Sequence, residues 1–483
     1  MRLRPGLVAF MTLLGGASFA SLTYHVIDLG TLGGTSSNAT AVNSAGQLVG
    51  YSTTASGATH AFLYSGGTLT DLGTLGGGYS FATAVNASGE VVGYSDTAQG
   101  VDHAFSYAGG QMTDVGSSRS SYSYAYGVNW SGQICGVADA GSSIFHAFLE
   151  SQGVWTDLGT LGGTYSEAYA VNDLGVVVGY GDTATQSHAF SDTNGVMTDL
   201  GTLGGTVSYA VAVNLSGQAV GNSNLVGDNF THGFIYSGTT MSDVGTLGGS
   251  ESWALGINAS GEVVGYADKA GDAVSHGFLY SGGSMIDLNS ILDAASMNYT
   301  ILEADWIADD GYIAATGLAP DGQDHAFLLT PNAGVAGTVT LQDFTGNVTL
   351  VPVTIEIRTA GTTNVLQRQT VYLNPDGSFS FPCSLVGTFD VAAKAPHWLR
   401  KKISGVVFSG NGIVSGLGFS LINGDVTGDN VINLADLIAI SAAWRSTPGS
   451  ANWNPNADVN GDGVVNLADW IVVSRNWRKS GDL

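Results

Sequence analysis

Short runs of alternating apolar and polar residues cover most of this chain and return at regular intervals. Each run is four to six residues long, and turn signals of the Asn-x-x-Gly and Ser-Gly-Gly kinds separate the runs. Alternation with period two predicts half-buried strands, and the short polar connections predict hairpins. Four runs return in fixed order: x-Ala-Val-Asn, x-Val-Val-Gly-Tyr, His-Ala-Phe-Leu-Tyr and x-Met-Thr-Asp-Leu-Gly. Each unit is therefore predicted to be a four-stranded antiparallel meander.

The motif Asp-Leu-Gly-Thr-Leu-Gly-Gly fixes the length of the unit. It occurs at 28–34, 71–77, 157–163 and 199–205, with one change at 243–249 and degenerate copies at 114 and 287. Its aspartates are spaced 43, 43, 43, 42, 44 and 44 residues apart: Asp28, Asp71, Asp114, Asp157, Asp199, Asp243 and Asp287. Four-stranded units of about 40–50 residues have the dimensions of β-propeller blades. We therefore expect a mainly β chain in which residues 21–330 form a seven-bladed β-propeller, with an open β-solenoid as the alternative.

The two ends of this repeat region are out of phase with the units. The region opens on a solitary last-strand sequence, Tyr24-His-Val-Ile-Asp-Leu-Gly30, and the last unit stops at His325-Ala-Phe-Leu-Leu without an Asp motif. We expect the N-terminal strand to supply the missing fourth strand of the final unit. Such an offset would close the units into a ring, because the first strand of the chain would pair with the last unit.

Seven histidines stand at the same place in the units: His60, His103, His146, His188, His232, His276 and His325. A feature that recurs in every unit is best explained by the needs of the fold, because a catalytic site is usually singular. We expect each imidazole to bond an aspartate or a backbone carbonyl of its own blade; a metal-binding ring in a central channel is the alternative. The recurring Asn turns receive the same interpretation, with Asp309-Asp310-Gly311 standing in for the seventh.

The His-Ala-Phe units, coupled to Asp-Leu-Gly-Thr-Leu-Gly-Gly, resemble those of the extracellular HAF-repeat family over residues 24–330. The family has no established activity, so the resemblance implies export and a repeat fold but no reaction. The sequence contains no Gly-x-Ser-x-Gly elbow, no His-Glu-x-x-His and no phosphate-cradling loop. A glycosidase would need two positioned carboxylates. The candidates are the carboxylates that break the repeat pattern: Glu167, Glu251, Glu303, Asp305 and Asp309.

The period stops after Pro331, and about seven strands with period-two alternation are predicted over residues 333–422. We expect a small β-sandwich that acts as a spacer. It resembles the transthyretin-like and carboxypeptidase-regulatory-like modules of secreted proteins. Basic residues gather near His397 and Trp398, and we interpret them as a solvated strand edge, with a ligand-binding patch as the alternative: Lys394, Arg400, Lys401 and Lys402.

Two copies of one loop, 33 residues apart, carry the clearest chemical signal, at 425–436 and 458–469. Each copy puts oxygen-bearing side chains at loop positions 1, 3, 5, 9 and 12, with a backbone carbonyl at position 7. Ca²⁺ takes about six to eight oxygen ligands in flexible geometry, and this spacing surrounds it with them. The apolar residues at position 8, Ile432 and Val465, can pair the loops back to back. Helices are expected to follow at 434–444 and 467–477.

This duplicated loop and helix, with no entering helix, resembles an EF-hand-like type I dockerin over residues 423–480. The resemblance implies two Ca²⁺ sites and a cohesin-like partner, with a Ca²⁺-folded tail without a partner as the alternative. The first loop departs from the family at Thr427, where Asn or Asp is usual. Both loops carry Leu-Ala at positions 10 and 11, where cellulosomal dockerins often place hydroxyl residues that meet cohesin. The implied ligands are Asp425, Thr427, Asp429, Val431 (carbonyl), Asn433 and Asp436, then Asp458, Asn460, Asp462, Val464 (carbonyl), Asn466 and Asp469.

Composition narrows the compartment and the partners. The chain has 14 basic against 39 acidic residues, which disfavours nucleic acid and anionic membranes as partners. Residues 1–20 have the pattern of a signal peptide that ends in Ser18-Phe19-Ala20, and no later stretch is long and apolar enough to span a membrane. We predict a secreted, extracellular protein. Cys135 stands where sister units carry valine, so a buried free thiol is favoured over a disulfide with Cys383.

Three functions remain open at this stage. The preferred one is a non-catalytic binding protein whose propeller presents a face for a glycan or protein ligand, while the dockerin-like module attaches it to a scaffold. The second is a polysaccharide-active glycoside hydrolase carried by the propeller, and the third is a structural surface-layer component. The even repeats and the lack of a singular acid pair favour the first. The ligand, the existence of a cohesin partner and the oligomeric state stay open.

Overall fold

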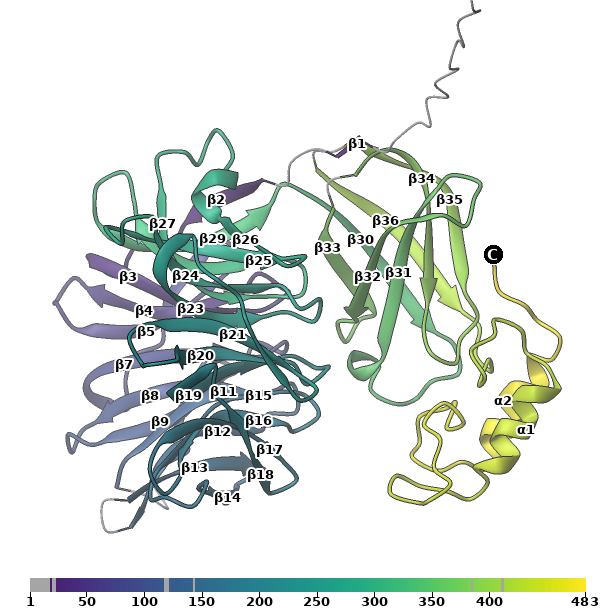
Figure 1. Cartoon of the computed structure of the whole chain (residues 1–483), viewed down its shortest axis with the longest axis horizontal. Coiled ribbons are helices and arrows are strands. Elements are labelled where there is room, and N and C mark those ends of the chain that lie inside the picture. Colours follow the sequence, from purple (N-terminus) through teal and green to yellow (C-terminus); the bar gives the residue numbers. More distant parts are fainter. Residues whose placement is uncertain (1–17, 20–22, 117–120, 142–143, 384, 410–411) are drawn as a thin grey trace, which may run out of the picture.

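The structure is a computed structural model that describes residues 18–19, 23–116, 121–141, 144–383, 385–409 and 412–483. Most of the predicted signal peptide therefore lies outside the described residues. The described residues are mainly β, with two α-helices near the C-terminus. The repeat region (residues 23–331), the middle module (333–422) and the C-terminal module (423–480) follow one another in space as they do in the sequence (Figure 1).

The repeat region contains seven four-stranded antiparallel sheets, as the four landmarks per unit predict. A single parallel bridge, Thr59 to Tyr79, joins the first two sheets. The first three sheets are β3 (Gly33–Val42), β4 (Leu48–Thr54), β5 (Thr59–Ser65) and β6 (Thr68–Asp71); β7 (Gly76–Val85), β8 (Val91–Thr97), β9 (Asp102–Ala108) and β10 (Gln111–Asp114); and β11 (Ser123–Val128), β12 (Ile134–Gly141), β13 (Ile144–Ser151) and β14 (Val154–Gly159).

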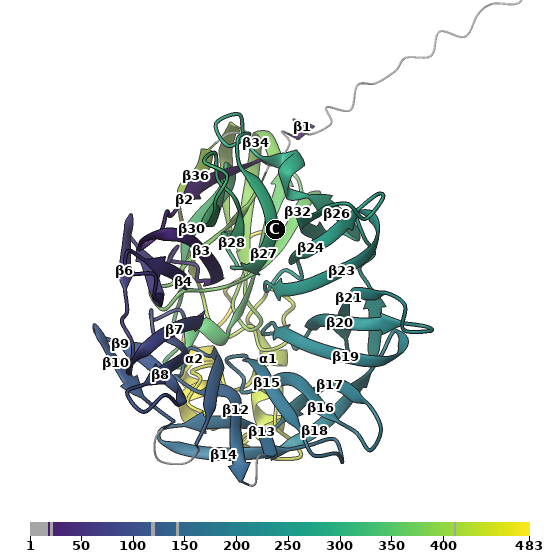
Figure 2. The ribbon, with the colours of Figure 1, turned by 90° about the vertical axis from the view of Figure 1, so that its left-hand side faces the viewer.

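The next three sheets are β15 (Ser166–Val171), β16 (Val177–Asp182), β17 (Ser187–Thr193) and β18 (Val196–Gly201); β19 (Gly204–Val213), β20 (Ala219–Leu225), β21 (Thr231–Ser237) and β22 (Thr240–Asp243); and β23 (Gly248–Ile257), β24 (Val263–Lys269), β25 (Ser275–Ser281) and β26 (Ser284–Asp287). A short 3₁₀ helix, η1 (Leu288–Ile291), follows. The seventh sheet holds β27 (Thr300–Ile307), β28 (Ile313–Leu318), β29 (Asp324–Pro331) and β2 (Tyr24–Asp28). Viewed from the side of the repeat region, the sheets follow one another around a common centre (Figure 2).

Strand β2 pairs antiparallel with β29, from Tyr24 opposite Pro331 to Asp28 opposite Phe327. The N-terminal strand therefore is the fourth strand of the last sheet, which confirms the expectation drawn from the phase of the repeats. Two segments almost 300 residues apart in sequence share one sheet.

Small apolar clusters between consecutive sheets form the core of the repeat region. In one of them, Val178 and Ala189 of the fourth sheet pack with Phe234 of the fifth. The phenylalanine of every His-Ala-Phe or His-Gly-Phe landmark is buried, with exposed fractions of 0 to 3%: Phe62, Phe105, Phe148, Phe190, Phe234, Phe278 and Phe327. Full burial of such a side chain stabilises a fold by about 1.5–3 kcal/mol. The recurring landmarks therefore stabilise the packing between sheets.

The middle module has two sheets that face each other across one core. The first contains β34 (Leu385–Lys394), β31 (Pro352–Thr359), β32 (Val365–Tyr372), β35 (Lys401–Ser409) and the two-residue β1 (Ser18–Phe19); the second contains β33 (Ser378–Pro382), β30 (Ala333–Leu341) and β36 (Gly412–Leu421). A 3₁₀ helix, η2 (Val348–Leu350), precedes β31. Val335 and Phe419 of one sheet share the core with Ile355 of the other. Strand β1 lies immediately before the cleavage site predicted at residue 20.

The C-terminal module consists of two loop-and-helix halves. Helix α1 spans Leu434–Ala442 and α2 spans Leu467–Arg475. The position-8 residues Ile432 and Val465 are both buried in the module's core. Among the described residues, no backbone hydrogen bond joins Ile432 to Val465. Instead, each loop pairs with the segment that follows the other half's helix: Ile432 bonds Lys479 and Arg478, and Val465 bonds Arg445 and Ser446.

Two sequence expectations on the whole chain can be compared directly with the structure. Cys135 and Cys383 are both buried free thiols, as the valine-like setting of Cys135 predicts. Within the described residues, neither helix has the length and apolar character needed to cross a bilayer.

Candidate functional site

In the first loop of the C-terminal module, the predicted ligands converge around Asp425 and Asp436, whose side chains are fully buried. Asp436 accepts hydrogen bonds from the Thr427 backbone (2.9 Å) and hydroxyl (3.0 Å) and from the Asn433 backbone (2.8 Å). Asn433 is the N-cap of α1 and forms a capping box with Asp436. The predicted ligands at loop positions 3, 9 and 12 therefore lie together at the start of one helix.

The second loop repeats this arrangement. Asp469 accepts from the backbone nitrogens of Asn460 (3.2 Å) and Asn466 (2.8 Å), and Asn466 caps α2 in the same way. Asp458 accepts from three consecutive backbone nitrogens, those of Gly461, Asp462 and Gly463. The left-handed φ of +82° at Gly463 lets the loop turn at this point.

Several features of the loops suit a hard cation. The Oδ1 atom of Asp425 is buried and has no hydrogen-bond partner. Burial raises the pKa of the Asp425, Asp458 and Asp469 carboxyls above the ordinary value for aspartate. A bound cation would offset this cost, because it stabilises the charged form of a buried carboxylate. No group of three or more His, Cys, Asp or Glu side chains among the described residues is placed to hold a metal. The predicted shells, however, also draw on amide, hydroxyl and backbone oxygens, which Ca²⁺ accepts.

Each of the four basic residues near His397 and Trp398 faces an acid: Lys394 and Lys401 pair with Asp425 and Asp482 near the C-terminus, and Arg400 and Lys402 pair with Glu356 and Asp390 of their own module. Their interpretation as a solvated edge is therefore wrong. Lys394 Nζ lies 2.5 Å from Asp425 Oδ2 and also donates to the Trp398 carbonyl at 2.6 Å. Lys401 forms an ion pair with Asp482 at 3.3 Å. His397 and Trp398 are buried, and His397 Nδ1 lies 2.9 Å from Asn423 Oδ1. The sequence shows the cluster of charges but not the acids that it faces.

Apolar packing and hydrogen bonds also join the middle module to the C-terminal module. Leu399 of the middle module is part of the C-terminal module's apolar core. The Thr345 backbone and hydroxyl donate to the Asn460 carbonyl at 2.8 and 2.9 Å. A Cβ atom at Gly461 would overlap the ring of Phe344. The middle module therefore contacts both predicted Ca²⁺ loops, which a flexible spacer would not do.

Apolar side chains that sequence reasoning did not single out are exposed beside both loops. They occupy equivalent positions in the two halves, 33 residues apart, and have nearly equal exposed fractions. The pairs are Leu434 and Leu467 (61% each), Ile438 and Ile471 (60% and 53%), Val431 and Val464 (40% and 38%), and Trp444 and Trp477 (38% each). Their repetition at helical spacing is the signal by which the sequence could have revealed them.

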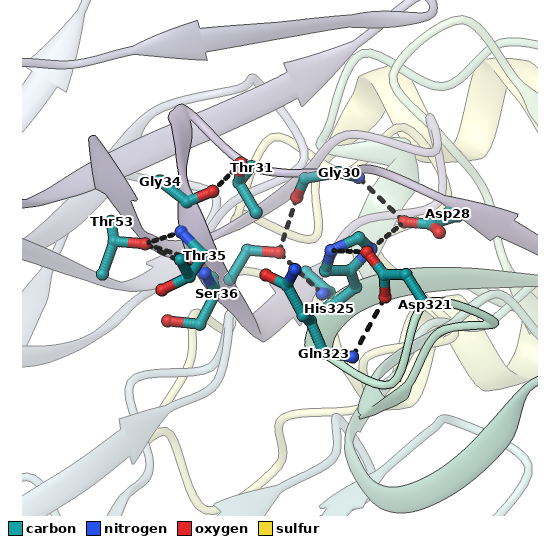
Figure 3. A network of polar contacts seen from close by, with 12 residues as sticks. Asp28, Gly30, Thr31, Gly34, Thr35, Ser36, Thr53, Asp321, Gln323 and His325 are labelled. Atoms are coloured by element: carbon teal, nitrogen blue, oxygen red, sulfur yellow. Dashed lines mark hydrogen bonds and ion pairs between the residues drawn. The ribbon is translucent and has the colours of Figure 1, made fainter. Parts of the chain in front are cut away.

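The seven repeat histidines each lie beside the aspartate of their own sheet, as expected. Six of the contacts join residues 11 apart, such as His60 and Asp71, with Nδ1 2.8–2.9 Å from a carboxylate oxygen. The seventh joins His325 to Asp28 (Figure 3). The histidines therefore do not converge on one centre.

The recurring asparagines form a second network, which links neighbouring sheets. The Nδ2 atom of each of the first five asparagines donates to the backbone carbonyl of the next unit's asparagine at 2.9–3.0 Å, along the series Asn43, Asn86, Asn129, Asn172, Asn214 and Asn258. In the seventh unit Ala308 stands at this position, because its backbone makes the turn bonds that Asn43 makes in the first. Asp309-Asp310-Gly311 therefore makes the seventh turn, as expected, and Ala308 takes the place of the asparagine. The Asp309 side chain accepts from the Ala259 backbone at 2.7 Å.

A cavity of about 230 Å³ lies where these asparagine turns face the middle module. Trp130, Asp173 and Asp309 line it from the repeat region, and Asn374 and Pro375 line it from the middle module. Burial raises the pKa of Asp173 and Asp309. This end of the repeat region is therefore covered.

The carboxylates that break the repeat pattern are spread over several sheets. Glu167 lies on β15, Glu251 on β23, and Glu303 with Asp305 on β27. Asp309 lies beyond β27 at the covered end. Only Glu303 and Asp305 act strongly on each other: burial and the Glu303 charge raise the pKa of Asp305 well above its usual range.

Comparison with known proteins separates the chain into recognisable parts. Residues 423–476 match the model of the type I dockerin domain. Residues 164–393 match a family described as a protein of unknown function, DUF3466. No curated protein matches the chain significantly. From here on, the C-terminal module is called the dockerin-like module.

Solved structures with detectable similarity are distant. A mutant type II cohesin–X–dockerin complex from Acetivibrio cellulolyticus is 23% identical over 31% of this chain and 97% of that chain, with a TM-score of 0.26. A puromycin-hydrolyzing peptidase from Mycobacterium tuberculosis is 11% identical over 61% of this chain and 51% of that chain, with a TM-score of 0.43. Trypanosoma rangeli sialidase is 11% identical over 84% and 92%, with a TM-score of 0.30. At TM-scores below 0.5, none of these supports a conclusion about function.

Proposed function

We propose that this protein is a secreted, non-catalytic binding protein that attaches to a scaffold through its dockerin-like module. The match to the type I dockerin domain supports a cohesin-like partner. The observation that carries the proposal is the duplicated set of exposed apolar side chains beside the two loops. Exposed large apolar groups that recur in two equivalent places indicate a protein interface rather than chance exposure.

Two Ca²⁺ ions would hold these faces in place. In the first loop the ligands would be Asp425, Thr427, Asp429, Asn433 and Asp436 with the Val431 carbonyl; in the second they would be Asp458, Asn460, Asp462, Asn466 and Asp469 with the Val464 carbonyl. The fully buried Asp436 and Asp469 are also the N3 residues of the two capping boxes. Ca²⁺ would therefore fix the start of each helix, and with it the exposed residues that follow.

The repeat region would then present the ligand-binding face, as a closed seven-bladed propeller. The pairing of β2 with β29 and the seven similar sheets support this arrangement. The end with the asparagine turns is covered by the middle module. The opposite face is therefore the one available to an extracellular ligand.

Surface plasmon resonance with an immobilised type I cohesin tests the docking function. We expect the full chain to bind in Ca²⁺ and to lose binding in EDTA. Because the two apolar faces are equivalent, Ile438→Asp or Ile471→Asp alone should leave one face able to bind. The double variant should bind at least about tenfold more weakly. Val226→Asp, at an 80% exposed site of the repeat region, is the matched control.

The docking proposal fails if the double variant binds as the unaltered chain does. It also fails if no member of a panel of type I cohesins binds in the presence of Ca²⁺. Near-ultraviolet circular dichroism in Ca²⁺ shows whether each variant has kept its fold.

A further inference from the structure

One register of the repeat region differs from sheet to sheet, although the landmarks around it are constant. It is a pair of residues opposite each other on the first and second strands of each sheet. In the first sheet, for example, Asn38 lies opposite Tyr51, and Tyr51 lies opposite Ala61 of the His-Ala-Phe landmark on the third strand. The pairs are Asn38–Tyr51, Phe81–Tyr94, Tyr124–Val137, Glu167–Tyr180, Tyr209–Asn222, Trp253–Tyr266 and Glu303–Thr316. Residues that serve the fold recur in every unit, so a position that varies is free to serve a ligand.

Aromatic rings dominate this register. Each of the first six sheets places at least one ring there, and contacts run between neighbouring sheets, such as Tyr51 to Phe81 (4.7 Å between centroids) and Tyr180 to Tyr209 (4.6 Å). Trp253 and Tyr266 stack at 5.1 Å within the sixth sheet. These rings are only half-buried. In the first sheet the Asn38–Tyr51 pair lies farther along the strands from the Asn43 turn than the Val42–Leu48 pair does, so this register is nearer to the face away from the middle module.

The seventh sheet replaces the rings with acids. Glu303 takes the ring position on β27, and Asp305 follows at the β-bulge that interrupts this strand's register between Ala304 and Trp306. The equivalent bulge residues in the other sheets carry no charge: Thr40, Thr83, Tyr126, Tyr169, Val211 and Leu255. A bulge re-aims one side chain, and bulges are common beside binding sites.

The rings of the neighbouring sheets flank these two acids. Strand β27 lies between β3 and β23 (Figure 2). On one side, the Thr316 hydroxyl accepts from the Ala39 backbone at 3.1 Å and lies 3.4 Å from Asp305 Oδ2. Burial, followed by the charges of Asp305 and Glu303, raises the pKa of Tyr51. On the other side, burial followed by the Glu303 charge raises the pKa of Tyr266 to about 12.

Among the described residues, no Lys or Arg forms an ion pair with Glu303 or Asp305. Between residues 23 and 331 the sequence has two basic residues, Arg119 and Lys269. Lys269 is paired with Asp287 at 2.9 Å, and Arg119 lies outside the described residues. Within the described structure, Glu303 accepts no hydrogen bond, and Thr316 is the one side chain that bonds Asp305. Close, poorly solvated carboxylates without a counter-ion attract a positive charge from outside.

We infer that Glu303 and Asp305, with the rings of Tyr51, Trp253 and Tyr266, form a binding site for an organic ammonium group. The carboxylates neutralise the charge of the ligand, and the rings contact its alkyl groups through their electron-rich faces. This inference deepens the proposed function, since it names a ligand class for the open face of the repeat region. It rests on that face being accessible.

Isothermal titration of the full chain in Ca²⁺ with choline tests the site. The control ligand is 3,3-dimethylbutan-1-ol, which has the same shape but no charge. We expect choline to bind at least about tenfold more tightly than the neutral alcohol. Glu303→Gln and Asp305→Asn should each weaken choline binding by about tenfold or more. Asp324→Asn removes an equal charge from an exposed position of β29, and we expect it to leave the affinity within about twofold.

Three results would overturn the site: no binding of choline, equal binding of the two ligands, or choline binding by Glu303→Gln that equals that of the unaltered chain. Near-ultraviolet circular dichroism shows whether Asp305→Asn folds. If it does not fold, the choline affinity of Glu303→Gln tests the site, because Glu303 is only half-buried. The titration contains no cohesin and the docking experiment contains no choline. Failure of one proposal is therefore distinguishable from failure of the other.

Discussion

The Nδ1 atom of His325 lies 2.8 Å from Oδ1 of Asp28, and this contact joins residues 297 positions apart. In the other six sheets the same contact joins residues 11 apart across one hairpin. At this junction of the two ends, called the seam below, Asp28 also accepts from the Gly30 backbone at 2.9 Å (Figure 3). The Ser37 hydroxyl accepts from the Ala326 backbone. A local contact of the repeat unit thus becomes the contact that connects the two ends of the repeat region.

Removal of the seam carboxylate should release β2. Asp28→Ala loses the His325 contact and the turn bond to Gly30, and we expect a loss of about 1–2 kcal/mol in unfolding free energy. Hydrogen exchange should show faster exchange at residues 24–28 and in β29, their partner strand. Asp157→Ala removes the same contact within the third sheet and is the control. Unchanged protection of residues 24–28 in Asp28→Ala would show that the seam contact does not hold the strand.

The asparagine network should contribute to cohesion between the sheets. Asn172→Asp keeps an oxygen for the turn nitrogens of Leu174 and Val176 but replaces the amide that donates to the Asn214 carbonyl. A carboxylate facing a carbonyl should cost about 1–3 kcal/mol in urea unfolding. Asn194→Asp, in an exposed hairpin turn, is the control and should change stability by less than about 0.5 kcal/mol. Equal stabilities of the two variants would contradict the role of the network.

Lys394 should make the dockerin-like module less dependent on Ca²⁺. Its ammonium group neutralises the buried Asp425 from the middle module and competes with a cation for the same carboxylate. Lys394→Met should therefore lower the Tm in EDTA and raise the Ca²⁺ affinity of the first loop, so that the Tm difference between Ca²⁺ and EDTA widens. Lys401→Met, which removes a more exposed pair with Asp482, is the control. A Tm difference that stays the same or narrows in Lys394→Met would refute the coupling.

Asp310 should make the stability of the chain fall as the pH rises from about 4 to about 8. Burial raises the pKa of its carboxyl to about 8, at a small cavity lined also by Pro331 and Phe381. Because the folded pKa exceeds the unfolded value, the folded state binds more protons between pH 4 and 8, and stability falls as the pH rises through this window. Asp310→Asn should remove most of this fall in urea titrations at pH 5 and pH 8. Asp321→Asn, in an exposed turn, should leave the slope intact; the same slope in both variants would argue against the assignment.

The repeat fold was predictable because its determinants recur. The period of the Asp motif, four landmarks per unit and the out-of-phase ends are visible as letters, and they predicted the strands and the pairing of β2 with β29. Strand β36 was not identified, because its glycines hide the alternation and its parallel pairing with β30 is non-local.

The candidate sites were predictable to different degrees. The loop residues stand close in sequence, so their spacing alone indicated a shared shell. Lys394 and Asp425 are 31 residues apart and belong to different modules, and only the fold brings them together. Glu303 and Asp305 break the repeat pattern, so the sequence indicated them as candidate functional carboxylates. Their meeting with rings from two neighbouring sheets depends on the order of the sheets around the centre, which no local pattern records.

The most direct test of the central proposal is the number of Ca²⁺ ions that the full chain binds. Isothermal titration of Ca²⁺ into EDTA-treated, dialysed protein should give two sites, and the signal of helix in circular dichroism should rise with their occupancy. Asp436→Asn and Asp469→Asn should each leave one site, and the double variant should leave none. No binding of Ca²⁺ by the unaltered chain, or two sites retained in the double variant, would contradict the account.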